Sequence, residues 1–237
     1  GGTTATNTDG STTTSVSANS TAGFSIVSYT GTGSVATLGH GLSTAPSTVW
    51  VRRLNVSDWV VGSNGLASWN YVLNLNSTSN AADQVNQFNG TAPTTSLVTL
   101  GTEGQTNQSG IGFIMYCFSD IAGFSKSGSY TGNGNADGPF VYTGFKPAFV
   151  MMKTSSIASN DWVMFDNKRL GYNVSNDSLK PNSASTEQTG LDIDLLSNGF
   201  KMRGTQNDFN GSGGNYIYMA FAAAPLVGTN NVPATAR

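Results

Sequence analysis

Two side chains suited to nucleophilic or acid–base chemistry occur once each in this sequence, His40 and Cys117. His40 lies between glycines in LGHGLSTAP, and a catalytic histidine would need a nucleophile and an orienting acid in mutual contact. Cys117 lies in GFIMYCFSD, an apolar setting that favours a buried, inert thiol. A single cysteine forms no disulfide within its own chain. We interpret both residues as structural and predict no catalytic residue.

The best candidate for a metal site is a run of amide and carboxylate side chains. Asn133, Asn135 and Asp137 alternate along GNGNADG, which superficially resembles a calcium loop. An EF-hand loop needs a bidentate acid at its twelfth position, where this chain continues into a strand-like segment. One histidine and one cysteine far apart do not form a zinc site. We interpret the run as a turn, with a calcium site as the alternative, and predict no metal and no cofactor.

Paired carboxylates raise a different possibility, because glycoside hydrolysis needs two acids across a cleft. Asp192 and Asp194 alternate with apolar residues in LDIDLL, so a strand here places both on one side. Together with Glu187 they allow the hypothesis of a glycan depolymerase. We expect no enzyme activity and keep the depolymerase as an alternative.

Aromatic rings are candidates for binding, since they offer large and rigid contact surfaces. Trp69 and Tyr71 lie in LASWNYVLNLN, and Tyr172 lies in KRLGYNVSND. We predict these three as surface contacts, because the two halves of the chain, described below, differ in these segments. Trp59 and Trp162 each follow an aspartate at matching places in the two halves, and we predict that both lie in the core.

The composition restricts the kind of protein. Of 237 residues, 11 are Lys or Arg and 13 are Asp or Glu, or 10% charged against about a quarter in typical domains. A net charge of −2 leaves no basic stripe for nucleic-acid phosphates. No apolar run reaches the roughly 18–20 residues of a membrane helix. We expect a turn-rich all-β protein with no nucleic-acid binding and no membrane insertion.

The two halves of the chain repeat each other. Five segments recur in the same order about 100 residues later, namely GFS, YTGxG, a proline followed by a short apolar run, DWV, and the pair NQSGIGFIMYCF and NGSGGNYIYMAF. A period of this length is a whole domain, because solenoid repeats are shorter. We predict a tandem duplication over residues 23–122 and 123–225. Residues 1–22 are predicted as an N-terminal arm or linker, and 226–237 as a C-terminal tail.

Within each unit the pattern is that of antiparallel strands. The apolar runs STVWVRR and AFVMMK are each followed by a polar turn and a second run, which predicts a hairpin. LDIDLLSNGFKMR alternates and then turns at Asn198-Gly199, where glycine accepts a positive φ. We predict two tandem antiparallel β-sandwich domains of about seven or eight strands each, behind an extended N-terminal arm.

As a set, these segments resemble a domain that recurs in virion proteins of tailed bacteriophages, marine ones especially. The resemblance covers Thr21 to about Pro225 and rests on TAGFSIVSYTGTGSVATLGHGLSTAPSTVWVRR, YCFSDIAGFSKSGSYTGNGNADGPFVYTGFKPAFVMMK and LLSNGFKMRGTQNDFNGSGGNYIYMAF. Proteins of this family typically carry the domain at the C-terminal end of tail-fibre-like or collar-like structural proteins, and they have no established enzyme activity. The resemblance implies a location and a class of role, and it implies no site residue.

We therefore expect a virion structural protein, a tail-fibre or surface-appendage module on the extracellular particle that contributes to host attachment through surface glycans. A capsid-decoration or vertex-fibre protein that stabilises the shell is the alternative. The expected partners are other virion proteins and other copies of the chain, in a trimer or higher assembly, because cyclic contacts build such appendages. An apolar sheet face not used inside one sandwich would serve these contacts.

Overall fold

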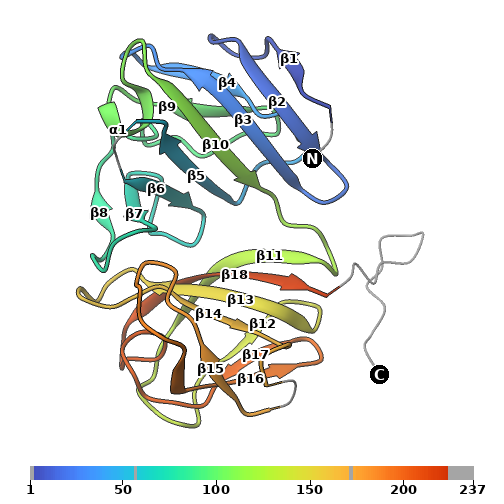
Figure 1. Cartoon of the computed structure of the whole chain (residues 1–237), viewed down its shortest axis with the longest axis vertical. Coiled ribbons are helices and arrows are strands. Elements are labelled where there is room, and N and C mark those ends of the chain that lie inside the picture. Colours follow the sequence, from blue (N-terminus) through green and yellow to red (C-terminus); the bar gives the residue numbers. More distant parts are fainter. Residues whose placement is uncertain (1–2, 56–57, 171–172, 224–237) are drawn as a thin grey trace. The chain divides into compact units, whose positions relative to one another are not determined.

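The structure, a computed structural model, describes residues 3–55, 58–170 and 173–223 (Figure 1). These residues form mainly antiparallel strands, which confirms the predicted all-β fold. In these ranges the helical structure is limited to α1 (Gly104–Asn107), and no helix is long and apolar enough to span a membrane. The predicted C-terminal tail, 226–237, lies outside the described residues.

The chain divides into two compact units. The first combines Gly1–Leu75 with Ala81–Asp120, and the second combines Asn76–Asn80 with Ile121–Arg237. The division after residue 120 falls close to the boundary predicted after residue 122. Asn76–Asn80 lies within the first predicted repeat but belongs to the second unit.

The described residues of the first unit form ten strands: β1 (Ala5–Asn7), β2 (Thr14–Asn19), β3 (Phe24–Thr30), β4 (Ala36–Gly39), β5 (Thr48–Arg53), β6 (Trp59–Ser63), β7 (Tyr71–Asn74), β8 (Ala82–Asp83), β9 (Leu97–Leu100) and β10 (Gly112–Phe118). Eight of them form one sheet in the order β1-β2-β3-β10-β5-β6-β7-β8, and β4 pairs with β9. The core lies between these sheets, where Val27, Val51 and Met115 of the large sheet pack with Leu38 and Leu100.

The described residues of the second unit form eight strands: β11 (Ser125–Thr131), β12 (Phe140–Tyr142), β13 (Pro147–Thr154), β14 (Val163–Asp166), β15 (Ser175–Ser178), β16 (Gln188–Leu196), β17 (Gly199–Met202) and β18 (Asn215–Ala222). They form two four-stranded sheets, β11-β18-β13-β14 and β12-β17-β16-β15. Val150, Met152 and Phe165 of the first sheet pack with Ile193 and Phe200 of the second, so this unit is also a sandwich.

The central strands of the two units have the same order. The run β3-β10-β5-β6 corresponds to β11-β18-β13-β14. The predicted hairpins are confirmed, because β5 pairs with β6, β13 pairs with β14, and β16 pairs with β17 around Ser197 and Asn198. The duplication itself stays a prediction, which the shared strand order supports.

The N-terminal residues are part of the first unit, so the prediction of an extended arm is wrong for the residues that the structure describes. β2 pairs along the edge of β3, with Val16 opposite Val27, and β1 pairs with β2. Between them, the Ser11 N–H donates to the Thr37 carbonyl of β4 at 3.0 Å. The segment looked like a linker because it is poor in apolar residues. An edge strand needs few of them, since one of its faces meets solvent.

Candidate functional site

Charged side chains of this charge-poor chain gather beside two aromatic rings on the outer face of the β12-β17-β16-β15 sheet. Side chains alternate along a strand, so the neighbours of the core residues Val141, Ile193 and Phe200 point outward. We call the following set the β12 face: Asp137, Phe140, Tyr142, Asp194, Lys201 and Arg203.

The charged members of the β12 face form one connected network. The sheet register places Lys201 between Phe140 and Asp194. Lys201 Nζ lies 2.5 Å from Asp137 Oδ1, and Arg203 Nη1 lies 4.0 Å from the same oxygen. Arg203 Nε lies 3.3 Å from Asp194 Oδ2. The hydrogen bond from Lys201 lowers the pKa of Asp137. The network pairs two basic with two acidic side chains, so their formal charges cancel.

The aromatic members of the β12 face present ring surface to solvent. Phe140 is 46% exposed and Tyr142 is 58% exposed, whereas Val141 between them is 6% exposed. Two residues apart on one side of a strand, the side chains start roughly 7 Å from each other. The Phe140 ring lies against Gly199, because a Cβ added at Gly199 would be 2.9 Å from two ring carbons. The ring therefore packs on the glycine and stays partly exposed.

Tyr142 is held in place by Lys126 of β11. Lys126 Nζ donates to the Tyr142 carbonyl at 3.1 Å and lies 5.3 Å from the centre of the Tyr142 ring. The second contact is a cation–π interaction. Both contacts order the strand and the ring before any ligand arrives, which reduces the conformational entropy lost on binding.

The run GNGNADG is a turn, as predicted. The Asn135 N–H donates to Asn133 Oδ1 at 3.0 Å, and the Asp137 N–H donates to Asn135 Oδ1 at 2.9 Å. The turn thus explains the alternation of these side chains, and it delivers Asp137 to the β12 face. In the part of the chain that the structure describes, no group of three or more His, Cys, Asp or Glu side chains is arranged to hold a metal ion.

The tyrosine of the repeated YTGxG motif makes the same hydrogen bond in both units. Tyr29 Oη donates to the Thr106 carbonyl at 2.6 Å, and Tyr130 Oη donates to the Phe209 carbonyl at 2.6 Å. Burial raises the pKa of both tyrosines well above the ordinary value, so both hydroxyls keep their protons.

The asparagine after each of these carbonyls binds the turn that follows the tyrosine. In the first unit, Asn107 Nδ2 donates to the carbonyls of Ser34 and Gly101, both at 2.7 Å. Its Oδ1 accepts from the Thr32 N–H at 2.8 Å. We call this arrangement the asparagine clamp.

The second unit has the same asparagine clamp. Asn210 Nδ2 donates to the carbonyls of Asn135 and Gly204 at 2.8 and 2.7 Å. Its Oδ1 accepts from the Asn133 N–H at 3.0 Å. The residues that the two units share therefore hold the scaffold together, and a binding site is better sought where the units differ.

A family model described as a domain of unknown function (DUF7483) matches residues 1–225. The chain belongs to this family. The match runs through both units and includes the N-terminal strands, as expected if β1 and β2 are integral to the domain. No curated protein and no solved structure matches the chain.

Of the three aromatic residues predicted as surface contacts, Trp69 lies in the core, and that prediction is wrong. Its side chain is 5% exposed and packs edge-on against Phe88, with ring centres 5.3 Å apart. Its indole N–H donates to Asn64 Oδ1 at 2.8 Å, which satisfies the only polar group of a buried tryptophan. Tyr71 is half-buried at the start of β7. Tyr172 lies outside the described residues.

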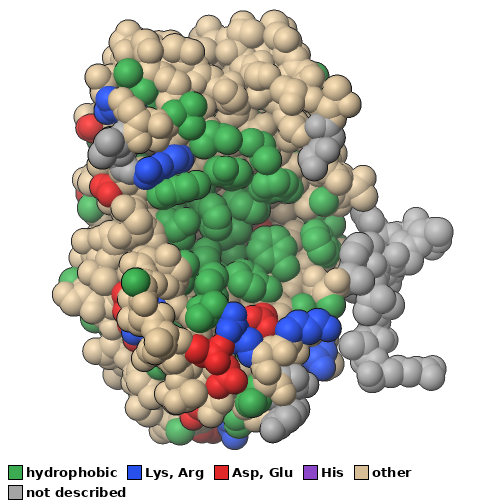
Figure 2. All heavy atoms as spheres, in the orientation of Figure 1, with side chains coloured by type: hydrophobic (Ala, Val, Ile, Leu, Met, Phe, Trp, Pro, Cys, Tyr) green, Lys and Arg blue, Asp and Glu red, His purple; other side chains and the backbone are tan. Residues whose placement is uncertain are grey.

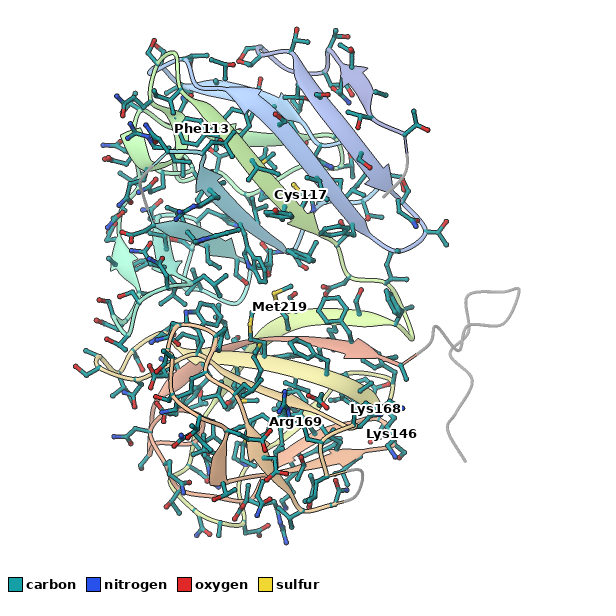
Figure 3. The ribbon with its side chains drawn as sticks, in the orientation of Figure 1. Phe113, Cys117, Lys146, Lys168, Arg169 and Met219 are labelled. Carbon is teal, nitrogen blue, oxygen red and sulfur yellow. The ribbon has the colours of Figure 1, made fainter. Side chains whose placement is uncertain are left out.

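His40 and Cys117 are both buried in the first unit. The Nε2–H of His40 donates to the Thr94 carbonyl at 3.2 Å, and Nδ1 accepts from the Leu42 N–H at 3.2 Å. Burial lowers the pKa of His40, so its ring is neutral around pH 7. Cys117 on β10 (Figure 3) lies in the core, where burial raises its pKa to about 12. This confirms the prediction of a buried thiol, which stays protonated.

Two of the acids considered for hydrolysis form ion pairs with arginines. Asp194 pairs with Arg203, and Glu187 pairs with Arg169. Asp192 lies on the same side of β16 as Asp194, as the alternation predicts. The carboxylates of Asp194 and Glu187 thus each face a guanidinium group.

A second surface feature is the outer face of the large sheet in the first unit. Trp50 and Phe118 have ring centres 4.9 Å apart, Phe24 and Phe118 5.1 Å, and Trp59 and Tyr116 5.9 Å. All five rings, which we call the aromatic face, are half-buried, so the prediction that Trp59 lies in the core is wrong. Figure 2 shows hydrophobic side chains gathered over β10 and β5. The five rings make this outer face apolar.

Phe140 and Tyr142 were not among the residues predicted as surface contacts. The signal was present in PFVYTG, where two aromatic residues alternate with a valine directly after a turn. Alternation shows that the rings and the valine lie on opposite sides of a strand, but it does not say which side meets the core.

Proposed function

We propose that the chain is a structural module of a bacteriophage virion, part of a tail fibre or similar surface appendage, that contributes to host attachment without catalysing a reaction. The β12 face carries the proposal, because ordered and exposed rings beside a balanced charge network form a binding surface on a rigid sheet. The sequence resemblance to tailed-phage virion domains supplies the location. In this role the chain assembles with further copies, in a trimer or higher assembly, and with other virion proteins.

The aromatic face supports one alternative, a decoration or vertex-fibre protein that stabilises the capsid shell. Such a protein needs an apolar surface to seat on other subunits, and it needs no ligand at the β12 face. Both roles place the chain on the virion, and only host attachment makes the β12 face functional.

The location is tested by gold-labelled antibody and cryo-electron microscopy of purified particles. We expect label on tail fibres or other external appendages. Label confined to the capsid shell would favour the decoration role. Presence only in the cytoplasm of infected cells would refute both.

Host attachment is tested by adsorption competition. Cells preincubated with the purified chain should adsorb fewer phages, and the double variant Phe140→Ala/Tyr142→Ala should lose most of this competition. Leu54→Ala is the matched control, since Leu54 is 64% exposed and belongs to the first unit, whereas the β12 face belongs to the second. Equal competition by the double variant and the wild type would show that the β12 face does not bind the host.

A further inference from the structure

We infer that the ligand of the β12 face is an uncharged saccharide, stacked on Phe140 and Tyr142 and hydrogen-bonded through its hydroxyl groups to Asp137, Lys201 and Arg203. The inference rests on the proposed binding role of this face and names the chemical class that fits it.

The ring pair favours a ligand with a flat C–H surface. Phe140 packs on Gly199 and is still 46% exposed, and Tyr142, 58% exposed, follows on the same side of the strand. The face of an aromatic ring carries partial negative charge and attracts the weakly positive hydrogens of C–H groups. A sugar ring presents such a C–H surface with hydroxyls around its edge.

The charged network favours hydroxyl groups at the rim of the ligand. Asp137 is 80% exposed at its side chain, and its Oδ1 is shared by Lys201 and Arg203. Carboxylate oxygens accept hydrogen bonds, whereas ammonium and guanidinium groups donate them. A hydroxyl is both donor and acceptor, so a row of hydroxyls satisfies the alternating groups of this network.

Charge balance argues against an acidic ligand. The cations Lys201 and Arg203 already face the carboxylates of Asp137 and Asp194. A carboxylate or sulfate on the ligand would have to displace one of these pairs and would leave a protein carboxylate unpaired. An uncharged ligand leaves every pair intact.

A protein partner fits the β12 face less well. Stable protein interfaces bury about 800 Å² per partner around an apolar centre that is depleted in charge. Here two rings border directly on charged groups. The small, mixed surface matches a sugar site, in which a few polar groups fix the orientation of the ligand.

Saturation-transfer NMR on the full chain tests the inference. The probes are uncharged gluco-, manno- and galacto-oligosaccharides, compared with sialylated and sulfated oligosaccharides. We expect transfer to the ring C–H protons of at least one uncharged series. Phe140→Ala/Tyr142→Ala should weaken its binding about tenfold or more. Asp137→Asn should weaken it less, and Leu54→Ala should not change it.

Phe140→Leu is a second variant that controls for misfolding, because leucine still covers Gly199 with an apolar side chain but has no aromatic ring. It should fold normally by circular dichroism and still bind more weakly. Binding restricted to charged oligosaccharides, or binding that the ring variants leave unchanged, would overturn the inference. So would the absence of any saturation transfer, even if the chain still competes for adsorption, in which case the attachment role stands and the receptor is not an uncharged saccharide. Saccharide binding by a chain that is absent from virions would leave this inference standing and refute the proposed function.

Discussion

The two units differ at one edge of their sandwiches, the edge next to β3 in the first unit and β11 in the second. In the first unit, β2 continues the sheet beyond β3, and Ser11 bonds to Thr37 of β4, so one N-terminal segment connects both sheets. In the second unit, β11 and β12 are the last strands of their sheets among the described residues, and Lys126 connects them through Tyr142. The connection between the two sheets is thus made by the strands β1 and β2 and the turn between them in the first unit, and by a single lysine in the second.

This difference separates the scaffold from the surface. β3 and β11 both end in Ser-Tyr-Thr and lead into turns held by asparagine clamps. On β4, Thr37 and Gly39 point outward, and Gly39 leaves no room for a side chain because Asn7 lies against it. On β12, the outward residues are Phe140 and Tyr142, which meet solvent. The residues common to both units hold their turns in place, whereas the outward residues of β4 and β12 differ between the units.

A basic side chain at corresponding positions of the two units, Arg52 in the first and Lys153 in the second, also has different surroundings in each. Arg52 of β5 lies opposite Ile114 of β10, as Lys153 of β13 lies opposite Ile217 of β18. The Arg52 guanidinium is half-buried, 5.5 Å from the centre of the Trp59 ring. Lys153 has no exposed surface, and its ammonium group donates to two backbone carbonyls in the second unit, those of Thr78 and Asn160.

Removing residues 1–19 should produce the largest effect, and it should destabilise the first unit while leaving the second unit unchanged. The first unit loses the hydrogen-bonded cover of β3 and the buried side chain of Val16, which together contribute several kcal/mol. Hydrogen exchange followed by mass spectrometry should show lost protection in β3 and β4 and unchanged protection in β11 and β12. Equal losses in both units would contradict the description of two separately stabilised sandwiches.

Asn107→Ala and Asn210→Ala should cost similar amounts, about 3 kcal/mol each, because each leaves one buried and one partly buried carbonyl without their donor. Denaturant titration of each variant measures the cost. The exposed Asn55→Ala is the control and should change stability by less than about 0.5 kcal/mol. A large cost in one unit alone would show that the two clamps are not equivalent.

A further effect appears only at alkaline pH and distinguishes Lys153 from Arg52. Burial lowers the pKa of Lys153 from 10.5 to about 8. Between these values the unfolded chain binds more protons than the folded chain. The contribution of this residue to the free energy of unfolding therefore rises with pH, by up to about 3 kcal/mol. Falling pH removes that contribution as it passes through about 8. Cys117 acts in the opposite direction above its ordinary pKa of 9.0, so the comparison with a variant is the measurement.

Lys153→Met should abolish this rise in denaturant titrations across the alkaline range. Arg52→Met should keep it, because this variant leaves Lys153 and its surroundings in the second unit unchanged. A Lys153→Met chain with the pH profile of the wild type would show that the lysine is not desolvated in the folded state.

Much of the strand pairing was predictable from the sequence, because it depends on neighbours in the chain. The turn at Asn198 and Gly199, the runs that became β5 and β6, and the burial of Cys117 follow from alternation and turn residues. The same local rules failed for the N-terminal strands, where an edge position replaces the usual need for apolar residues.

The candidate site was less predictable, because exposure depends on which layer covers a residue. Trp69 was expected at the surface and lies in the core, and Trp59 was expected in the core and lies half-buried on the outer face. Phe140 and Tyr142 went unnoticed in a three-residue strand.

By itself, the sequence determined that this protein is an all-β chain with strands paired by short turns and with two similar halves. Its alternating residues specify two sides for each strand, and its glycines and asparagines specify the turns. Only the tertiary structure decided which side of each strand meets the core, because that depends on contacts between residues far apart in the chain. It placed Asp137 beside Lys201 and Phe140 over Gly199, and so formed the β12 face from segments that the sequence keeps about 60 residues apart.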